Sequence, residues 1–255
     1  MNYYLTDSIF IKDGETFYEN DNNVKKINKS NWHKYLDDYG WSKLCLGWKK
    51  RLKEDGNNSC FGLLECGADG DCLFHVLCEA LNSEYLFKLR LPKYNVELLR
   101  KLAASEINKE NFNMILETYK LDYDENSFNI MNSWDPYEIK HIGQLKKEII
   151  VGGNNFWGDH ILLQLLQKKL KINIIILNSD NNKKTSNIDE RFTIHPIASL
   201  DLDNNEKTII IYYLDQYHFQ LVGYFDGNIM KTIFLKHEIP DILLKIYNND
   251  CRINY

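Results

Sequence analysis

The sequence lacks two features that would assign it to large classes of proteins. It has no excess of basic residues, because 31 Lys and Arg stand against 36 Asp and Glu, a formal net charge of −5. It also has no apolar run long enough to cross a membrane, since INIIIL and TIIIYYL, the longest, have the length of strands. Non-specific binding to nucleic acid depends on concentrated positive charge. We therefore expect neither nucleic acid nor a membrane as a partner.

A secretory signal is missing as well. The first residues, MNYYLTDSIFIKDG, have neither the basic start nor the unbroken apolar run of a signal peptide. Without such a signal, the six cysteines of the 255 residues are expected to be reduced thiols rather than disulfides. A cytoplasmic location is the corresponding expectation.

The short Cys-x-x-Cys knuckles of metal sites are also absent. Four cysteines recur at intervals of six residues: Cys60, Cys66, Cys72 and Cys78. On one helix, two residues six apart point roughly 120° away from each other. Their sulfur atoms would not converge on one ion, so we expect no metal and no cofactor.

What the sequence does contain predicts an α+β protein. Hydrophobic residues make up 44% of the chain, enough for a substantial core, and no internal repeat or long linker divides it. Short strands are expected in NYYLTDSIFI, and helices in WHKYLDDYG, WSKLCLGWKKRLKED and residues 96–107 and 112–119. WDPYEIKHIGQLKKEIIVGG predicts a helix with an Asp cap and a Pro at its first position. Strands are expected in CFGLLEC, INIIIL, KTIIIYYL, YHFQLVGYF and IMKTIFL, and a last helix after Pro240.

The stretch GADGDCLFHVLCEAL, residues 67–81, indicates a tight glycine turn that leads into a helix. Apolar residues recur with helical spacing at Leu73, Val76, Leu77, Ala80 and Leu81. Cys72 therefore lies in the first turn, where the helix dipole lowers the pKa of a thiol. The backbone N–H groups of Asp71 and Cys72 could point at one spot, as an oxyanion hole requires. The local alternative is that Cys72 is a small core residue beside an ordinary turn.

A nucleophilic cysteine needs a histidine, and His218 is the best placed of the seven. It lies in DQYHFQLVGYF, whose alternation predicts a strand, so that His218 and Gln220 share a face. A polar neighbour on that face could hold the imidazole in one orientation, as a general base requires. His75 lies only three residues after Cys72, and we expect it to have a surface or packing role.

Three sequence blocks resemble the signature blocks of the ovarian tumour (OTU) domain cysteine proteases. They are DGDCLF at 69–74, FWGDHILLQLLQKKLKINIIIL at 156–177 and YHFQLVGYF at 217–225, in the same order as in the family. The resemblance spans about residues 61–225 and extends to OTU-like proteins of large DNA viruses. It implies a papain-type cysteine protease fold with helices flanking a small central β-sheet.

The resemblance also implies a function and a set of site residues. OTU proteases are deubiquitinases, which cleave the bond after the C-terminal glycine of ubiquitin. By position, Cys72 would be the nucleophile, His218 the general base, and Asp69 the aspartate that is often counted as catalytic. The family commonly has Asp or Asn two residues after the histidine, where this chain has Gln220. Asp69 and Gln220 are therefore both candidates for the residue that orients His218.

Further expectations concern the groove, the domains and the partners. Trp157 and Gly158 are expected to line the substrate groove, with core packing as the alternative for Trp157. We divide the chain into an N-terminal extension that packs on the catalytic domain (1–59), the catalytic domain (60–226), and a strand and helix that complete it (227–255). Ubiquitin or polyubiquitin is the expected partner of a monomeric enzyme, in the host cytoplasm or the virion if the protein is viral. The alternatives are a protease that acts on another ubiquitin-like modifier or a viral polyprotein, and a non-catalytic ubiquitin-binding module.

Overall fold

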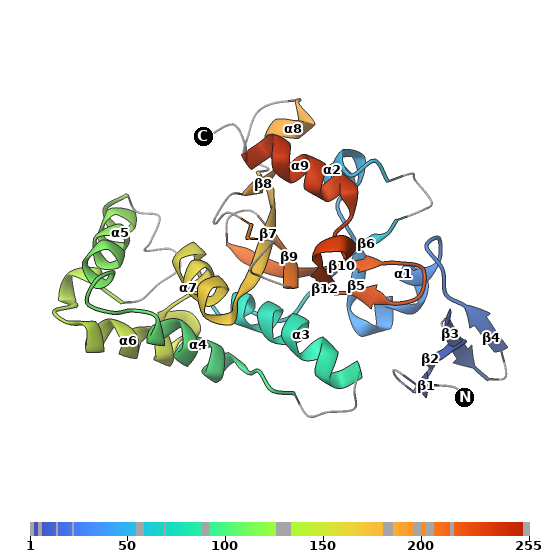
Figure 1. Cartoon of the computed structure of the whole chain (residues 1–255), viewed down its shortest axis with the longest axis horizontal. Helices are drawn as coiled ribbons and strands as arrows, with labels where there is room; N and C mark the ends of the chain where they lie inside the picture. Colours follow the sequence, from blue (N-terminus) through green and yellow to red (C-terminus); the bar gives the residue numbers. More distant parts are fainter. Residues whose placement is uncertain are drawn as a thin grey trace.

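The computed structural model describes residues 3–4, 7–13, 15–21, 23–54, 59–68, 70–87, 92–125, 134–180, 186–195, 200–201, 207–214 and 217–251. In this part of the chain, helices flank both faces of a mixed central sheet, and a smaller antiparallel sheet lies near the N-terminus (Figure 1). The predicted α+β class is confirmed.

The central sheet brings together strands from both halves of the chain. Its order is β5 (Trp41–Lys43), β6 (Phe61–Leu64), β10 (His218–Phe225), β9 (Lys207–Leu214), β7 (Ile172–Ser179) and β8 (Phe192–His195). Two short strands extend it, β11 (Met230–Lys231) beside β10 and β12 (Ile233–Leu235) beside β9. Strands β7 and β9 run parallel, and the other pairs are antiparallel. Strand β10 thus lies between β6 and β9, near the middle of the sheet.

Both faces of this sheet are buried, which explains why residues 174–177 of β7 form a continuous apolar run rather than an alternating one. Ile174 and Ile176 belong to a core formed with α3 (Cys72–Phe87), α4 (Val96–Ser105), α5 (Phe112–Asp124), α6 (Ile142–Val151) and α7 (His160–Leu170). Ile175 and Leu177 belong to a second core on the opposite face, with α2 (Leu46–Arg51) and α9 (Asp241–Cys251). The short helix α8 (Ile188–Arg191) precedes β8.

The N-terminal sheet packs against the far end of β10. It contains β1 (Tyr3–Tyr4), β2 (Ile9–Lys12), β3 (Glu15–Asn20) and β4 (Asn23–Lys26), and the single-turn helix α1 (Trp32–Tyr35) follows it. Ile9 and Trp32 form a small core with Phe225, the last residue of β10. The indole N–H of Trp32 also donates a hydrogen bond to the carbonyl of Ser59.

The segments before residue 59 and after residue 227 also contact each other. Arg51 of α2 forms an ion pair with Asp250 of α9, and both side chains are largely buried. Arg51 also lies 3.0 Å from the carboxylate of Asp189 in α8. The three helices are thereby joined across the second core. The predicted division into three segments stays a prediction.

Two predicted helices differ from the structure. The first part of WSKLCLGWKKRLKED is the strand β5, which pairs with β6, and only Leu46–Arg51 is helical. The strand is favoured because the indole of Trp41 packs over Gly62 and Gly223, which have no side chains of their own to block it. In WDPYEIKHIGQLKKEIIVGG, Asp135 caps only a 3₁₀ turn, Pro136–Glu138, and α6 begins after an extended residue, at Ile142.

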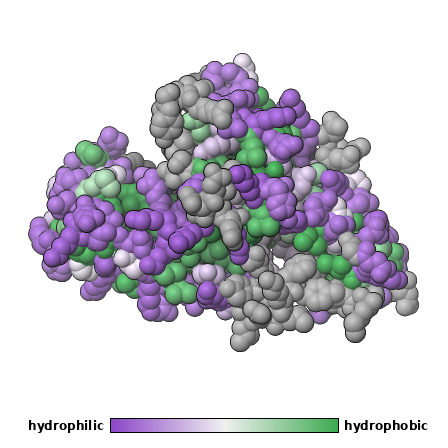
Figure 2. Space-filling model, viewed as in Figure 1, coloured by the Kyte–Doolittle hydropathy of each residue, from purple (hydrophilic) through white to green (hydrophobic). Residues whose placement is uncertain are grey.

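On the face shown in Figure 2, hydrophilic side chains cover most of the lobe formed by α4, α5 and α6. Over the ranges that the structure describes, none of the helices combines the length and the apolar character that crossing a membrane would require.

Candidate active site

The loop before Cys72 is held in place by close backbone contacts. Gly70 has a φ of +82°, and a Cβ atom placed on it would lie 2.2 Å from the carbonyl oxygen of Gly153. Its own carbonyl accepts a hydrogen bond from the Gly158 N–H at 3.2 Å. Only glycine fits this position, because it tolerates positive φ and has no Cβ. The loop therefore presents Cys72, the first residue of α3, from a fixed backbone.

The start of α3 supplies backbone donors near the thiol. The carbonyl of Asp71 accepts from the His75 N–H at 3.0 Å, so the helix begins at Cys72. Amides of the first helical turn have no carbonyl partner within the helix, and that of Cys72 is one of them. The Asp71 N–H, in contrast, donates to the Ala68 carbonyl at 3.3 Å. Of the two amides predicted to form an oxyanion hole, only that of Cys72 lies within the first helical turn, whereas the Asp71 amide is engaged in the preceding loop.

A buried arginine fixes the residue before the nucleophile. Arg100 of α4 is 2% exposed, and its Nε donates to Oδ1 of Asp71 at 2.7 Å. Its Nη atoms donate to the same carboxylate and to the carbonyls of Ile149 and Phe156, both at 2.9 Å. The guanidinium also lies 4.1 Å from the centre of the Phe74 ring. Arg100 therefore joins the loop before Cys72, which we call the catalytic loop, to the end of α6 and to the segment before α7.

His218 reaches the thiol from the neighbouring sheet. It is the first residue of β10, and its imidazole lies close to the Cys72 side chain. The interaction with Cys72, together with the hydrogen bond to Glu65, raises the pKa of His218 above its usual 6.5, although partial burial acts in the opposite direction. Nε2 of His218 lies 2.7 Å from Oε1 of Glu65. Because Glu65 engages Nε2, Nδ1 is the nitrogen left to exchange a proton with the thiol.

Glu65 is placed by the register between β6 and β10. Leu64, the last residue of β6, pairs with Leu221, so the next residue along, Glu65, stands opposite Gln220 and diagonal to His218. The Gln220 amide donates a hydrogen bond to Oε2 of Glu65 at 2.8 Å. One carboxylate thus accepts from the imidazole with one oxygen and from the amide with the other.

The orienting group on His218 is therefore one that the sequence analysis did not predict. Gln220 shares the face of His218, as expected, but its hydrogen bond goes to Glu65 rather than to the imidazole. Asp69 lies outside the described residues. The sequence does show Glu65 as a charged residue directly after the apolar strand CFGLL. It does not show that this strand pairs with a strand more than 150 residues away.

The surroundings of Cys72 differ from those of three other thiols that are buried or half-buried. Burial raises the pKa of Cys66 and of Cys78 to about 12, and that of Cys251 to about 11. Those thiols are protonated near neutral pH and therefore poorly nucleophilic. Cys72 has a basic partner in His218. Among the described residues, no three His, Cys, Asp or Glu side chains are grouped so that they could hold a metal ion.

The predicted groove residues lie beside the catalytic loop. Trp157 Cδ1 is 2.9 Å from the Cβ position of Gly70, and a Cβ on Gly158 would lie 2.6 Å from that of Leu73. Both residues therefore border the turn that presents Cys72. Their contribution to a substrate groove stays a prediction.

Together, the thiol, the imidazole and the carboxylate form a row of interacting groups suited to nucleophilic catalysis. The imidazole can take the thiol proton, the carboxylate can stabilise the resulting imidazolium, and the helix start can stabilise the thiolate. Cys72 lies on the first turn of a buried helix and His218 on a central strand. These rigid elements fix the relative positions of the two groups.

Comparisons with known proteins agree with this chemistry. A model of the OTU-like cysteine protease family matches residues 67–219, more than half of the chain. No curated protein matches the sequence.

Several solved structures are similar to the chain at low sequence identity. An OTU domain in complex with ubiquitin has 16% identity and a TM-score of 0.41, with 76% of this chain and 89% of that chain covered. An OTU deubiquitinase from Wolbachia pipientis wMel bound to ubiquitin has 14% identity and a TM-score of 0.42, with 66% and 98% covered. The viral OTU domain protease from Taggert virus has 14% identity and a TM-score of 0.37, with 75% and 90% covered.

Proposed function

The chain belongs to the family of OTU-like cysteine proteases, and we propose that it hydrolyses the peptide or isopeptide bond after the C-terminal glycine of ubiquitin. Ubiquitin is the substrate that the family implies. Its C-terminal tail is basic, and the chain has a formal net charge of −5, which suits such a partner.

The observation that carries the proposal is the closeness of Cys72 and His218 on two rigid elements, with Glu65 bonded to Nε2 of the imidazole. A binding module without turnover has no need for this arrangement. Although Gln220 departs from the family pattern, the imidazole still has a carboxylate partner, Glu65. The geometry therefore favours an active enzyme over the non-catalytic alternative.

The reaction follows from the positions of these groups. His218 accepts the proton of Cys72, and the thiolate attacks the carbonyl carbon of the terminal glycine. The Cys72 N–H is placed to donate to the developing oxyanion, and one such donor contributes about 3–4 kcal/mol in other hydrolases. The imidazolium then protonates the leaving amine, which departs and leaves a thioester on Cys72. His218 deprotonates a water molecule that hydrolyses the thioester and releases the ubiquitin carboxylate.

The first experiment is covalent labelling with ubiquitin that carries a thiol-reactive electrophile at its C-terminus, read by intact mass. We expect one ubiquitin adduct on the wild type, none on Cys72→Ala, and an unchanged adduct on the control Cys78→Ala. The control removes another thiol of α3, and burial raises the pKa of that thiol to about 12. No adduct on a folded wild-type protein, or an adduct on Cys72→Ala, would refute the proposal.

Cleavage of matched fusions tests the choice of substrate. Ubiquitin and its relatives, each fused to the same reporter, would be compared by kcat/KM. We expect ubiquitin to be the preferred substrate. Equal or faster cleavage of another ubiquitin-like fusion would assign the enzyme to that modifier instead.

We also propose that the enzyme is a monomer in a reducing compartment, the host cytoplasm if its source is viral. All six cysteines are free thiols in the structure, as the chemistry of a catalytic thiol requires. Light scattering on the purified chain would test the monomer, and imaging of a tagged chain in cells would test the location.

A further inference from the structure

Asp71 stands at the position from which a side chain normally caps a helix. It directly precedes Cys72, the first residue of α3. An aspartate at this position usually turns its carboxylate onto the unpaired N–H groups of the first helical turn. Among the described residues, however, the hydrogen bonds of this carboxylate go to Arg100 of α4 and none to the N–H of Leu73 or Phe74. The start of α3 therefore lacks the acidic cap that its sequence offers.

The guanidinium that binds the carboxylate is itself held in place from several sides. Arg100 is buried and donates to the carbonyls of Ile149 and Phe156, both at 2.9 Å. Its position also depends on Gly152, because a Cβ atom there would lie 2.1 Å from Nε of Arg100. The fold thus leaves space for one buried cation beside the catalytic loop, and the Asp71 carboxylate is the anion that it pairs with.

A carboxylate at the start of α3 would oppose the proposed reaction. The dipole and the unpaired amides of a helix start favour negative charge, and the reaction develops negative charge on the thiolate of Cys72 and on the oxyanion. If Asp71 capped the helix, its own charge would take up those amides and repel both of these anions. Arg100 instead holds the carboxylate on the side of α4, where the guanidinium also lies 4.1 Å from the centre of the Phe74 ring.

We propose that Arg100 is a positioning residue of the hydrolase. It holds the Asp71 carboxylate away from the start of α3 and thereby keeps the helix start available to the thiolate and the oxyanion. Arg100 acts through Asp71, so the effect of removing Arg100 should depend on whether the carboxylate is present. The inference rests on the proposed function for its kinetic test, and a second test uses no ubiquitin.

The kinetic test compares a single and a double variant. Arg100→Met releases the carboxylate, and Arg100→Met/Asp71→Ala removes the carboxylate as well. With a fluorogenic ubiquitin substrate, we expect Arg100→Met to lower kcat about ten- to hundredfold and to change KM less than about twofold, because the released charge acts on the reacting groups. The double variant should raise kcat at least about fivefold above that of Arg100→Met. A purely structural role predicts the opposite order, since the second substitution removes a further side chain.

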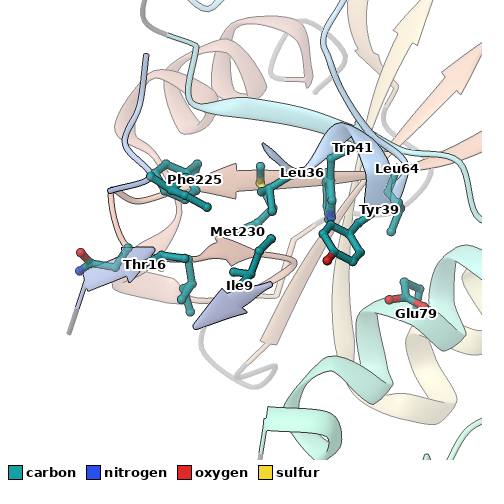
Figure 3. Close-up of a pocket in the computed structure, with 12 residues that line it drawn as sticks. Ile9, Thr16, Leu36, Tyr39, Trp41, Leu64, Glu79, Phe225 and Met230 are labelled. Carbon is teal, nitrogen blue, oxygen red and sulfur yellow. The ribbon is translucent and has the colours of Figure 1, made fainter. Parts of the chain in front are cut away.

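Three control variants accompany this comparison. Asp71→Asn keeps an acceptor for Arg100 without the charge and should retain most of the wild-type kcat. Lys101→Met removes an exposed cation from the same helix, α4, and should change nothing. Glu79→Gln removes an exposed carboxylate from α3, seven residues after Cys72, and should also change nothing. Figure 3 shows Glu79 at the wall of a separate cavity of about 340 Å³, whose other walls are mainly apolar.

The second test is the rate at which iodoacetamide alkylates Cys72, read by peptide mass. A carboxylate at the helix start disfavours the thiolate, so Arg100→Met should react about two- to tenfold more slowly than the wild type. The double variant should regain the wild-type rate. A loosened loop would have the reverse effect, because Cys72 is 3% exposed and would become more accessible. A wild type that does not cleave ubiquitin would overturn the proposed function, while this test would still decide the role of Arg100.

The proposal would be overturned by a wild-type kcat in folded Arg100→Met, by a double variant no faster than the single one, or by faster alkylation of Cys72 in Arg100→Met. Melting curves would establish that each variant is folded. If Arg100→Met does not fold, Arg100→Gln replaces it in the single and the double variant, because its amide can still donate to one of the two carbonyls.

Discussion

Removing the carboxylate of Glu65 is expected to slow the enzyme by a moderate and calculable amount. A hydrogen bond to a charged group contributes about 1.5–3 kcal/mol. The Glu65 side chain is 52% exposed and that of His218 18%, so water screens the pair and the lower end applies. A loss of about 1.4 kcal/mol from the transition state is a factor of about ten in rate. We therefore expect Glu65→Ala to lower kcat/KM about tenfold, and Glu65→Gln, whose amide oxygen can still accept from Nε2, by less.

The pH profile gives this prediction a signature that a loss of stability would not produce. Glu65 contributes to the raised pKa of His218 because a carboxylate stabilises the imidazolium. Without it, the pKa of His218 falls. The active thiolate–imidazolium pair then loses its proton at lower pH, so the alkaline limb of kcat/KM should move to lower pH in Glu65→Gln. Cleavage of a fluorogenic ubiquitin substrate between pH 5 and 10 would measure the shift.

A second substitution tests whether the carboxylate acts through its position. Aspartate at 220 would stand on the same face of β10 as His218, two residues away. The double variant Glu65→Ala/Gln220→Asp is therefore expected to recover part of the activity that Glu65→Ala loses. Glu110→Ala, a change on an exposed loop, is the control for the loss of a carboxylate. Wild-type kcat/KM and an unmoved alkaline limb in Glu65→Gln would refute the reasoning.

Four further predictions follow from the same structure. Arg100→Met should lower the free energy of unfolding by about 3–5 kcal/mol in urea titrations, because it leaves the carboxylate of Asp71 without its buried partner; a loss below 1 kcal/mol would contradict this. Gly70→Ala should abolish ubiquitin labelling, since its Cβ would meet the Gly153 carbonyl, whereas Gly143→Ala in α6 should leave labelling intact. The pKa of His218 is raised by folding, so its stabilising contribution is present below pH 6.5 and is lost as the pH rises through the folded-state value; the difference in unfolding free energy between wild type and His218→Ala should accordingly shrink with rising pH. Brief alkylation at pH 7, read by peptide mass, should modify Cys72 first, and three thiols only after denaturation: Cys66, Cys78 and Cys251.

Local patterns in the sequence predicted the elements that carry the thiol and the imidazole. The helical spacing after Cys72 reflects one buried face of α3, and its residues belong to the core as predicted. The alternation around His218 reflects a strand, and β10 has the predicted position. Both patterns are visible because each depends on contacts that a single element makes with the core.

Features that depend on pairing between distant segments could not be predicted in the same way. From the sequence, Trp41 is predicted to be part of a helix. It fits in a strand because Gly62 and Gly223, which lie in two other strands, leave space for its indole. From the sequence, Arg100 is an ordinary charged residue of a helix. Its burial is explained only by the fold, which brings Asp71 within hydrogen-bond distance. In both cases the deciding partner lies in a different element, and only the fold brings it close.

The position of Glu65 explains how the active site can keep a carboxylate without the family's usual residue after the histidine. Position 220 lies two residues from His218 on the same face of β10. The residue opposite position 220 is Glu65, which lies diagonal to His218 on the neighbouring antiparallel strand. A carboxylate at either place can reach Nε2, provided that its side chain is long enough to cross the diagonal. Glutamate has that length, and its second oxygen accepts from Gln220. The glutamine that departs from the family pattern thus helps to fix the carboxylate that orients His218.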